Sequence, residues 1–221
     1  MQVMWRRLAG LFLCAAGVVW ADVCEGLPSA PTSGASIFRL ANKNGPSFRI
    51  AIRSTGPAAG EIEVSRCQDG KRLQVLPITA QQPNDFARSF HAEDINFDGH
   101  LDFAVLIAFG GAWGSEQWWV YDPSTGRFVQ NQLTHAIAEL KAADYTYDPE
   151  KHELRTRYLT EPWGCGSTGD RYRVENNRLL LIHKEAPKPA NNTCRVVVSD
   201  LVNGAMRVTA VKRFIDGEPV K

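Results

Sequence analysis

Short segments with alternating polar and apolar side chains recur along most of this chain, separated by residues typical of turns. An alternation with a period of two is the pattern of a β-strand that buries one face. Residues 103–108 are instead apolar at every position, which is typical of a central strand buried on both faces. Residues 133–142 are the only stretch that favours a helix. The predicted strands are 48–53, 61–65, 73–78, 103–109, 117–122, 145–147, 153–158, 172–175, 179–183, 195–198 and 206–211.

The residues between these segments predict tight turns. Asn176-Asn177 and Asn203-Gly204 are pairs that accept the left-handed backbone of two-residue hairpins, and residues 123–126 and 149–151 combine proline with other turn formers. Strands at intervals of roughly eight to twelve residues, joined by such turns, are typical of antiparallel sheets. We therefore expect an all-β chain: an antiparallel meander that forms one β-propeller-like or sandwich-like domain with one short helix.

The first residues have the features of a cleaved signal peptide. Arg6 and Arg7 precede an apolar run of about 13 residues, 8–20, and the run ends in Val19-Trp20-Ala21, a small-x-Ala cleavage site. A membrane-spanning helix needs roughly 20 residues, so an uncleaved anchor is the less favoured alternative. We expect a signal peptide at 1–21, a flexible lead-in at 22–35, a calcium-binding domain at 36–221, and a periplasmic location without a membrane anchor after cleavage.

Composition narrows the classes of partner. The chain is 44% hydrophobic and 22% charged with a formal net charge of +1, and no basic block appears in it. These values are typical of a folded domain and give no reason to expect nucleic acid as a partner.

Export would place the cysteines in an oxidising compartment. Cleavage would remove Cys14 and leave Cys24, Cys67, Cys165 and Cys194, an even number that predicts two disulfides. Three pairings are open. We favour Cys24 with Cys67 and Cys165 with Cys194, because each pair lies within its own half of the chain. Zinc is disfavoured because no C-x-x-C spacing is present.

The strongest chemical signal is the pattern D-x-N-x-D-G-x-x-D at residues 94–102. Calcium prefers six to eight oxygen ligands, and side chains at alternate positions of a tight loop can converge on one ion. Position 12 is Val105 rather than the glutamate of an EF-hand, so water or another segment would complete the shell. We expect the ion to be structural rather than catalytic. The predicted calcium ligands are Asp94, Asn96, Asp98, His100 through its carbonyl group, and Asp102.

Two further segments are candidate binding loops. Residues 110–119 combine glycines with three tryptophans, and we expect Trp113 and Glu116 to be the exposed pair while at least one of Trp118 and Trp119 is a core residue. Residues 162–172 form the second candidate loop, which Cys165 would pin. Its candidate contact residues are Ser167, Gly169 and Tyr172.

Together these residues resemble a known family. Residues 94–103, the Gly110-Gly111 pair and the stretch WVYDPSTGRF at 119–128 are similar to calcium-binding periplasmic immunity proteins of bacteria. Members of that family inhibit lysozyme-type peptidoglycan hydrolases delivered by a type IV secretion system. The resemblance continues through 147–150 and 172–180. It implies a propeller-like or sandwich-like domain that inserts a loop into the hydrolase cleft, with Ser167, Gly169 and Tyr172 matching the inhibitory loop.

The expected function is therefore inhibition without turnover, with a lysozyme-like peptidoglycan hydrolase as partner and calcium as the bound ion. The sequence has no Gly-x-Ser-x-Gly, His-Glu-x-x-His or phosphate-binding Gly-x-x-x-x-Gly-Lys motif, so we do not expect an enzyme. A calcium-stabilised structural or adhesive module is the main alternative, and a secreted carbohydrate-active enzyme is a weaker one.

Overall fold

A computed structural model describes most of the chain from Ser36 onward. The described residues are 24, 35–42, 45–81, 86, 89–110, 113–140, 142, 144–159, 167–190, 193–215 and 218–220. The predicted signal peptide and nearly all of the predicted lead-in lie outside them. The first strand begins at Ser36.

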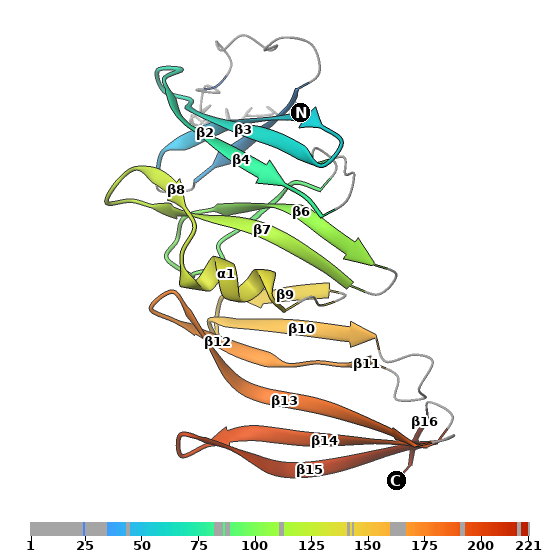
Figure 1. The fold of residues 1–221 in the computed structure, drawn as a ribbon. Helices are drawn as coiled ribbons and strands as arrows, with labels where there is room; N and C mark the ends of the chain where they lie inside the picture. Colours follow the sequence, from blue (N-terminus) through green and yellow to red (C-terminus); the bar gives the residue numbers. More distant parts are fainter. Residues whose placement is uncertain are drawn as a thin grey trace, which may run out of the picture.

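The described chain forms three antiparallel sheets, each built from a continuous stretch of sequence (Figure 1). This arrangement confirms the all-β prediction, and α1 (Gln132–Ala138) is the short helix. The first sheet contains β1 (Ser36–Ala41), β2 (Ser47–Gly56), β3 (Ala59–Arg66) and β4 (Arg72–Thr79), and the second contains β5 (His91–Glu93), β6 (Asp102–Gly110), β7 (Trp113–Asp122) and β8 (Arg127–Val129). The third contains β9 (Asp144–Asp148), β10 (Glu153–Leu159), β11 (Ser167–Thr168), β12 (Arg171–Glu175), β13 (Arg178–Ala190), β14 (Thr193–Val202), β15 (Ala205–Ile215) and β16 (Glu218–Val220).

Strand β6 is buried on both faces, as its continuous apolar sequence predicts. Phe103 and Val105 belong to a core shared with the first sheet, where Phe103 lies 4.8 Å from Phe128 between ring centroids. Ala104, on the opposite face, belongs to a second core shared with α1 and the third sheet. The neighbouring strand divides its tryptophans in the same way, because Trp119 packs in the first core and Trp118 in the second.

The helix ends earlier than the predicted span of 133–142. Asn131 and Thr134 form a capping box at its start, and Leu133, Thr134 and Ile137 are buried. Its last helical residue is Ala138. Further on, the carbonyl group of Ala142 accepts the N–H of Gly114 at 3.0 Å, which ties this part of the backbone to β7 instead of to another helical turn.

The predicted hairpin turns are confirmed. Asn176 and Asn177 have φ values of 51° and 57° and join β12 to β13. Asn203 and Gly204 have φ values of 50° and 78° and join β14 to β15. Positive φ at both central residues is the geometry that Asn and Gly accept at low cost.

The predicted pairing of Cys24 with Cys67 is also confirmed. The two residues form a disulfide with a Cα–Cα distance of 4.7 Å, which attaches Cys24 to the turn after β3. Cys194 is disulfide-bonded as well. Cys165, its predicted partner, lies outside the described residues. Among the helices of the described chain, none is long and apolar enough to cross a membrane.

Candidate functional site

The predicted calcium loop connects β5 to β6 and is wound around the side chain of Asp94. The carboxylate of Asp94 accepts the N–H groups of Asp98 at 3.1 Å and Gly99 at 2.9 Å. The side-chain oxygen of Asn96 also accepts the N–H of Asp98, at 3.3 Å. Phe97 and Gly99 have positive φ values of 59° and 88°, which makes the turn tight. Oxygens at the first and third loop positions therefore converge on one point.

Asp98 continues this arrangement at the fifth position. One of its oxygens accepts the N–H of His100 at 2.9 Å, and the other accepts the side-chain amide of Asn96 at 2.9 Å. The imidazole of His100 packs edge-on against Tyr121, with ring centroids 5.1 Å apart. The side chain of His100 is thus part of the packing, which leaves its carbonyl group as the predicted contribution to a metal.

Asp102 is fully buried and bridges two backbone segments. Its carboxylate accepts the N–H of Ile95 at 3.1 Å and the N–H of Tyr121 at 2.8 Å. The pKa of Asp102 is raised to about 8, mainly by burial and also by the nearby carboxylates of Asp98 and Asp94, while the two hydrogen bonds act in the opposite direction. Burial also raises the pKa of Asp94. A cation beside these carboxylates would favour their charged forms.

The donor set fits calcium in its chemistry. Asp94, Asn96, Asp98 and the His100 carbonyl group supply only hard oxygen ligands from one tight loop. Among the described residues, no group of three or more His, Cys, Asp or Glu side chains is arranged to hold a metal ion. In this loop one of the converging ligands is an asparagine, and Asp102 faces two backbone donors. Calcium binding at this loop therefore stays a prediction, and Asp94, Asn96 and Asp98 are the side chains that would bind the ion.

Contacts from the other two sheets hold the loop in place. The side-chain oxygen of Asn42, just after β1, accepts the N–H of Leu101 at 2.6 Å. The side-chain oxygen of Asn177, in the β12–β13 turn, accepts the amide of Asn96 at 3.3 Å. The sequence reading missed both asparagines, because only the fold brings these distant residues to the loop. The loop therefore lies where all three sheets meet.

The expectation of a loop before the predicted strand at 117–122 is wrong for residues 113–116, which belong to that strand. Strand β7 begins at Trp113 and pairs with β6 in a register that places Gly110 opposite Trp113 and Leu106 opposite Glu116. A Cβ atom at Gly110 would lie 2.4 Å from the indole nitrogen of Trp113, so the missing side chain leaves room for that ring. Trp113 is half-buried rather than freely projecting.

Glu116 is also not the exposed residue that the loop interpretation required. Its side chain is 14% exposed; it accepts the indole N–H of Trp118 at 3.0 Å and lies 3.3 Å from Nδ1 of His91. Burial raises the pKa of Glu116 to about 7, and burial lowers the pKa of His91. The distance is that of an ion pair, but loss of water disfavours the charged form of each side chain, so burial opposes a charged pair here.

The second candidate loop is partly β-structure as well. Ser167 is exposed and belongs to β11. A Cβ atom at Gly169 would lie 2.5 Å from the carbonyl oxygen of Thr156, and the N–H of Gly169 donates to Glu185 at 3.0 Å. The hydroxyl of Tyr172 donates to Asp170 at 3.3 Å, and burial raises its pKa. Close packing therefore surrounds Gly169 and Tyr172, while Ser167 faces solvent.

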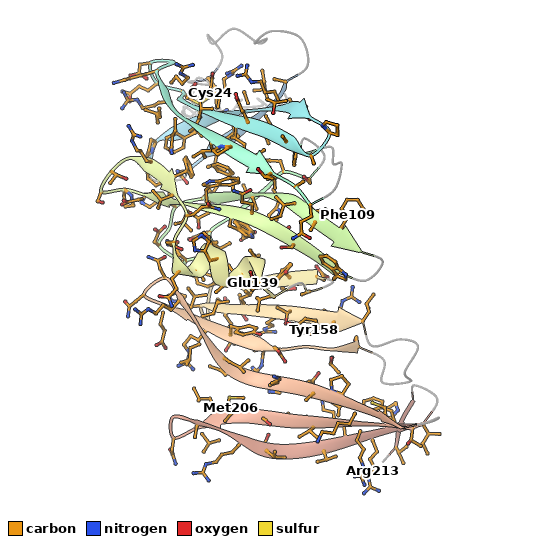
Figure 2. The ribbon with its side chains drawn as sticks, viewed as in Figure 1. Cys24, Phe109, Glu139, Tyr158, Met206 and Arg213 are labelled. Atoms are coloured by element: carbon orange, nitrogen blue, oxygen red, sulfur yellow. A yellow bond between two sulfur atoms is a disulfide. The ribbon has the colours of Figure 1, made fainter. Side chains whose placement is uncertain are left out.

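The structure brings Trp113 and Ser167 to the same side of the molecule. Gly114 donates its N–H to the carbonyl group of Ala142, and the hydroxyl of Tyr145 donates to the carbonyl group of Gly114 at 3.4 Å. Strand β9 then pairs with β10, whose last residue pairs with Ser167. Figure 2 shows the labelled Phe109 and Tyr158 on this side. We call this surface the hairpin edge: Phe109, Trp113, Leu159 and Ser167, with Phe109 and Leu159 exposed by 47% and 44%.

Comparison with known proteins gives a likeness of fold. No family model and no curated protein matches the sequence. A solved structure described as a Xanthomonas type IV secretion system related protein is 16% identical, with a TM-score of 0.52, and the match covers 82% of this chain and 96% of that one. The β-propeller domain of the trilobed protease from Pyrococcus furiosus is 12% identical with a TM-score of 0.34, and covers 85% of this chain and 57% of that one.

Proposed function

We propose that this protein is an exported, calcium-binding inhibitor of a peptidoglycan hydrolase, an immunity protein that blocks the hydrolase cleft and has no turnover of its own. Two observations support the proposal. The fold is similar over 82% of the chain to a protein related to the type IV secretion system of Xanthomonas. Residues 94–103 and 119–128 also resemble periplasmic immunity proteins that protect against hydrolases delivered by such a system.

The observation that carries the proposal is the position of the calcium loop relative to the hairpin edge. Asp102 closes the loop and is also the first residue of β6, and β6 leads directly to Phe109 at the hairpin edge. The bond from the Tyr121 N–H to Asp102 attaches the same point to β7, which begins with Trp113. A calcium ion in the loop would fix both strands of this hairpin at their other end.

The hairpin edge has the chemistry of a contact surface. Phe109 and Leu159 present apolar side chains to solvent at the ends of two neighbouring strand pairs, and Ser167 adds a hydroxyl group. Aromatic side chains such as Phe109 and Trp113 dominate the binding energy of many protein interfaces. We propose that these side chains, rather than Glu116 or Tyr172, enter the hydrolase cleft.

Inhibition of a peptidoglycan hydrolase tests the proposal. The protein from residue 22 onward would be titrated, with calcium, into lysozyme-like peptidoglycan hydrolases while lysis of peptidoglycan is followed by turbidity. Leu159→Ser should weaken inhibition at least about tenfold, the value of one buried apolar contact at an interface. Val75→Ser is the matched control, because Val75 is 45% exposed on β4, in the first sheet.

Three results would contradict the proposal. A hydrolase that stays fully active in excess inhibitor would remove the inhibitory function. Equal inhibition by the Leu159→Ser and wild-type proteins would remove the hairpin edge as the contact surface. Peptidoglycan turnover by the protein alone would favour the alternative of a carbohydrate-active enzyme.

A further inference from the structure

The long strands β13, β14 and β15 have two faces of different chemistry. The antiparallel register places Cys194, Val196 and Val198 on one face, where they are buried and pack with Phe214. The residues between them lie on the opposite face, which we call the cationic face. It contains Lys184, Lys188, Arg195, Val197, Met206, Val208, Val211, Arg213 and Ile215.

Four cations on this face form no ion pair within the described chain, although the charge of Lys184 also acts on Asp170. The side chains of Lys184, Lys188, Arg195 and Arg213 are exposed, and within the described chain none of them forms an ion pair or a hydrogen bond. The acidic residues of these strands, Glu185 and Asp200, lie on the other face. Glu185 is paired there with Lys212 at 2.6 Å, and Asp200 lies 2.6 Å from His183.

The positive charge is local rather than general. Residues 183–215 contain six basic and two acidic residues, an excess of four, whereas the whole chain has a formal net charge of +1. The next acidic residue along the sheet register is Glu218 of β16, opposite Ile215 at the end of the face. An anion approaching β13–β15 therefore meets uncompensated cations across three adjacent strands.

Apolar side chains lie among these cations and remain in water. Val208 is 64% exposed, Val211 52%, Ile215 50% and Met206 38%. Figure 2 labels Met206 and Arg213 toward the two ends of β15. In the described structure no element covers the cationic face. Exposed β-branched side chains at these levels, grouped on one sheet, are typical of a surface with a binding role.

We propose that the cationic face binds the surface of an anionic phospholipid bilayer. Lys and Arg side chains bring their charge to the level of lipid phosphates, while aliphatic side chains between them enter the boundary of the acyl chains. A protein partner fits less well, because the face lacks the Trp and Tyr side chains that usually supply the binding energy of protein interfaces.

A second copy of the chain is also disfavoured. Strand β16 pairs with β15 only at Arg213–Ile215, so the part of β15 before Arg213 is an open edge. Two copies joined through this edge would bring Arg207 and Lys212 of each copy close to those of the other. Like charges in directly opposed positions destabilise strand pairing, and cations on an edge strand are a common protection against it. The cationic face thus favours an anionic partner over a second copy of the chain.

Vesicle co-sedimentation tests this proposal. The wild-type protein should bind vesicles of equal parts phosphatidylglycerol and phosphatidylcholine and should not bind phosphatidylcholine alone. Each Lys or Arg near an anionic leaflet changes the partition coefficient about fivefold. Replacing Lys184, Lys188, Arg195 and Arg213 by Gln should therefore lower it by more than about 100-fold. The control replaces four exposed cations outside β13–β15, Lys71, Arg72, Arg127 and Lys151, by Gln and should reduce binding severalfold at most.

A second variant separates lipid from other anions. Val208→Ser with Val211→Ser should weaken binding to the anionic vesicles and leave the affinity for soluble polyglutamate unchanged. No binding to anionic vesicles, equal loss in the control and the four-cation variant, or no effect of the two Val→Ser changes on vesicle binding would each overturn the proposal. The hydrolase assay provides an independent readout, since these substitutions lie outside the hairpin edge and should leave inhibition unchanged.

Discussion

Asp102 and Tyr121 are joined by a 2.8 Å hydrogen bond from the Tyr121 backbone N–H to a carboxylate that is fully buried. The other oxygen of Asp102 accepts the N–H of Ile95, inside the loop. One side chain therefore connects the candidate calcium loop with the two strands that run to the hairpin edge. Changes at Asp102 should affect both the stability of the fold and the loop.

At about pH 6, below the raised pKa of Asp102, both the carboxyl group and its amide replacement are uncharged. Asp102→Asn should then lower the free energy of unfolding by about 1–3 kcal/mol even without calcium, because the amide nitrogen cannot accept a hydrogen bond and leaves a buried N–H unpaired. Urea denaturation in the presence of a chelator would measure the loss. Asp98→Asn is the comparison, since Asp98 is exposed and its change should cost less than about 0.5 kcal/mol. Equal stability of the two variants would contradict a bridging role for Asp102.

Calcium should stabilise the protein. Extracellular calcium modules have dissociation constants of about 10⁻⁴–10⁻³ M, so about 10 mM calcium would add roughly 1.4–2.7 kcal/mol. For a domain of this size the melting temperature should rise by roughly 3–11 °C. Differential scanning calorimetry with calcium, magnesium or chelator would show it. An identical Tm in calcium and chelator would remove the calcium site from the proposal.

Glu116 should make stability depend on pH. Because burial raises its pKa in the folded state to about 7, above the ordinary 4.5, the folded state holds this proton more tightly than the unfolded state does. The contribution of Glu116 to the free energy of unfolding is thus fully present below about pH 4.5 and is lost as the pH rises through about 7. The free energy of unfolding of Glu116→Gln, relative to that of wild type, should therefore increase by roughly 2 kcal/mol as the pH rises from about 5 to about 8.

Thermal unfolding at several pH values would measure that difference. Glu139→Gln, on an exposed helix C-cap, is the matched control and should follow the wild-type curve. A constant difference between Glu116→Gln and wild type across this pH range would show that the carboxylate does not titrate as its burial requires.

Loss of the disulfide between Cys24 and Cys67 should destabilise the first sheet. The bond closes a loop with a sequence separation of 43, for which chain entropy gives about 4 kcal/mol. Cys67→Ser should lower the free energy of unfolding by roughly 2–4 kcal/mol. Unfolding of the reduced wild-type protein is the reference, and a reduced protein as stable as the oxidised one would contradict this prediction.

The sequence was most informative where a short pattern determines the backbone. Residues 103–108 predicted a strand buried on both faces, because the side chains at odd and at even positions are all apolar. Strand β6 does have a hydrophobic core on each face. Asn176-Asn177 predicted a hairpin because few residues accept positive φ twice in succession. Strands β5, β8, β11 and β16 have only two or three residues each, too few for a period to appear.

The misreadings came from contacts that lie far away in sequence. Residues 110–119 contain glycines typical of a loop, but pairing with β6 makes Trp113 the first residue of a strand. Gly169 and Tyr172 appeared to be available for contacts, but Thr156 and Asp170 occupy their surroundings. The tight turn at residues 94–102 could be predicted from the spacing of its polar residues and glycine, whereas the supports from Asn42 and Asn177 depend on how the three sheets meet.

The separation of the three sheets along the sequence has a consequence for how the molecule assembles. Each sheet is complete before the next begins, at residues 36–79, 91–129 and 144–220, so most strand pairing joins neighbours and requires little loop closure. A chain that emerges from its N-terminus can form these units one after another. The 94–102 loop can form its hydrogen bond with Asn177 only when the third sheet has begun to form. The complete structure of this loop is therefore reached late in assembly.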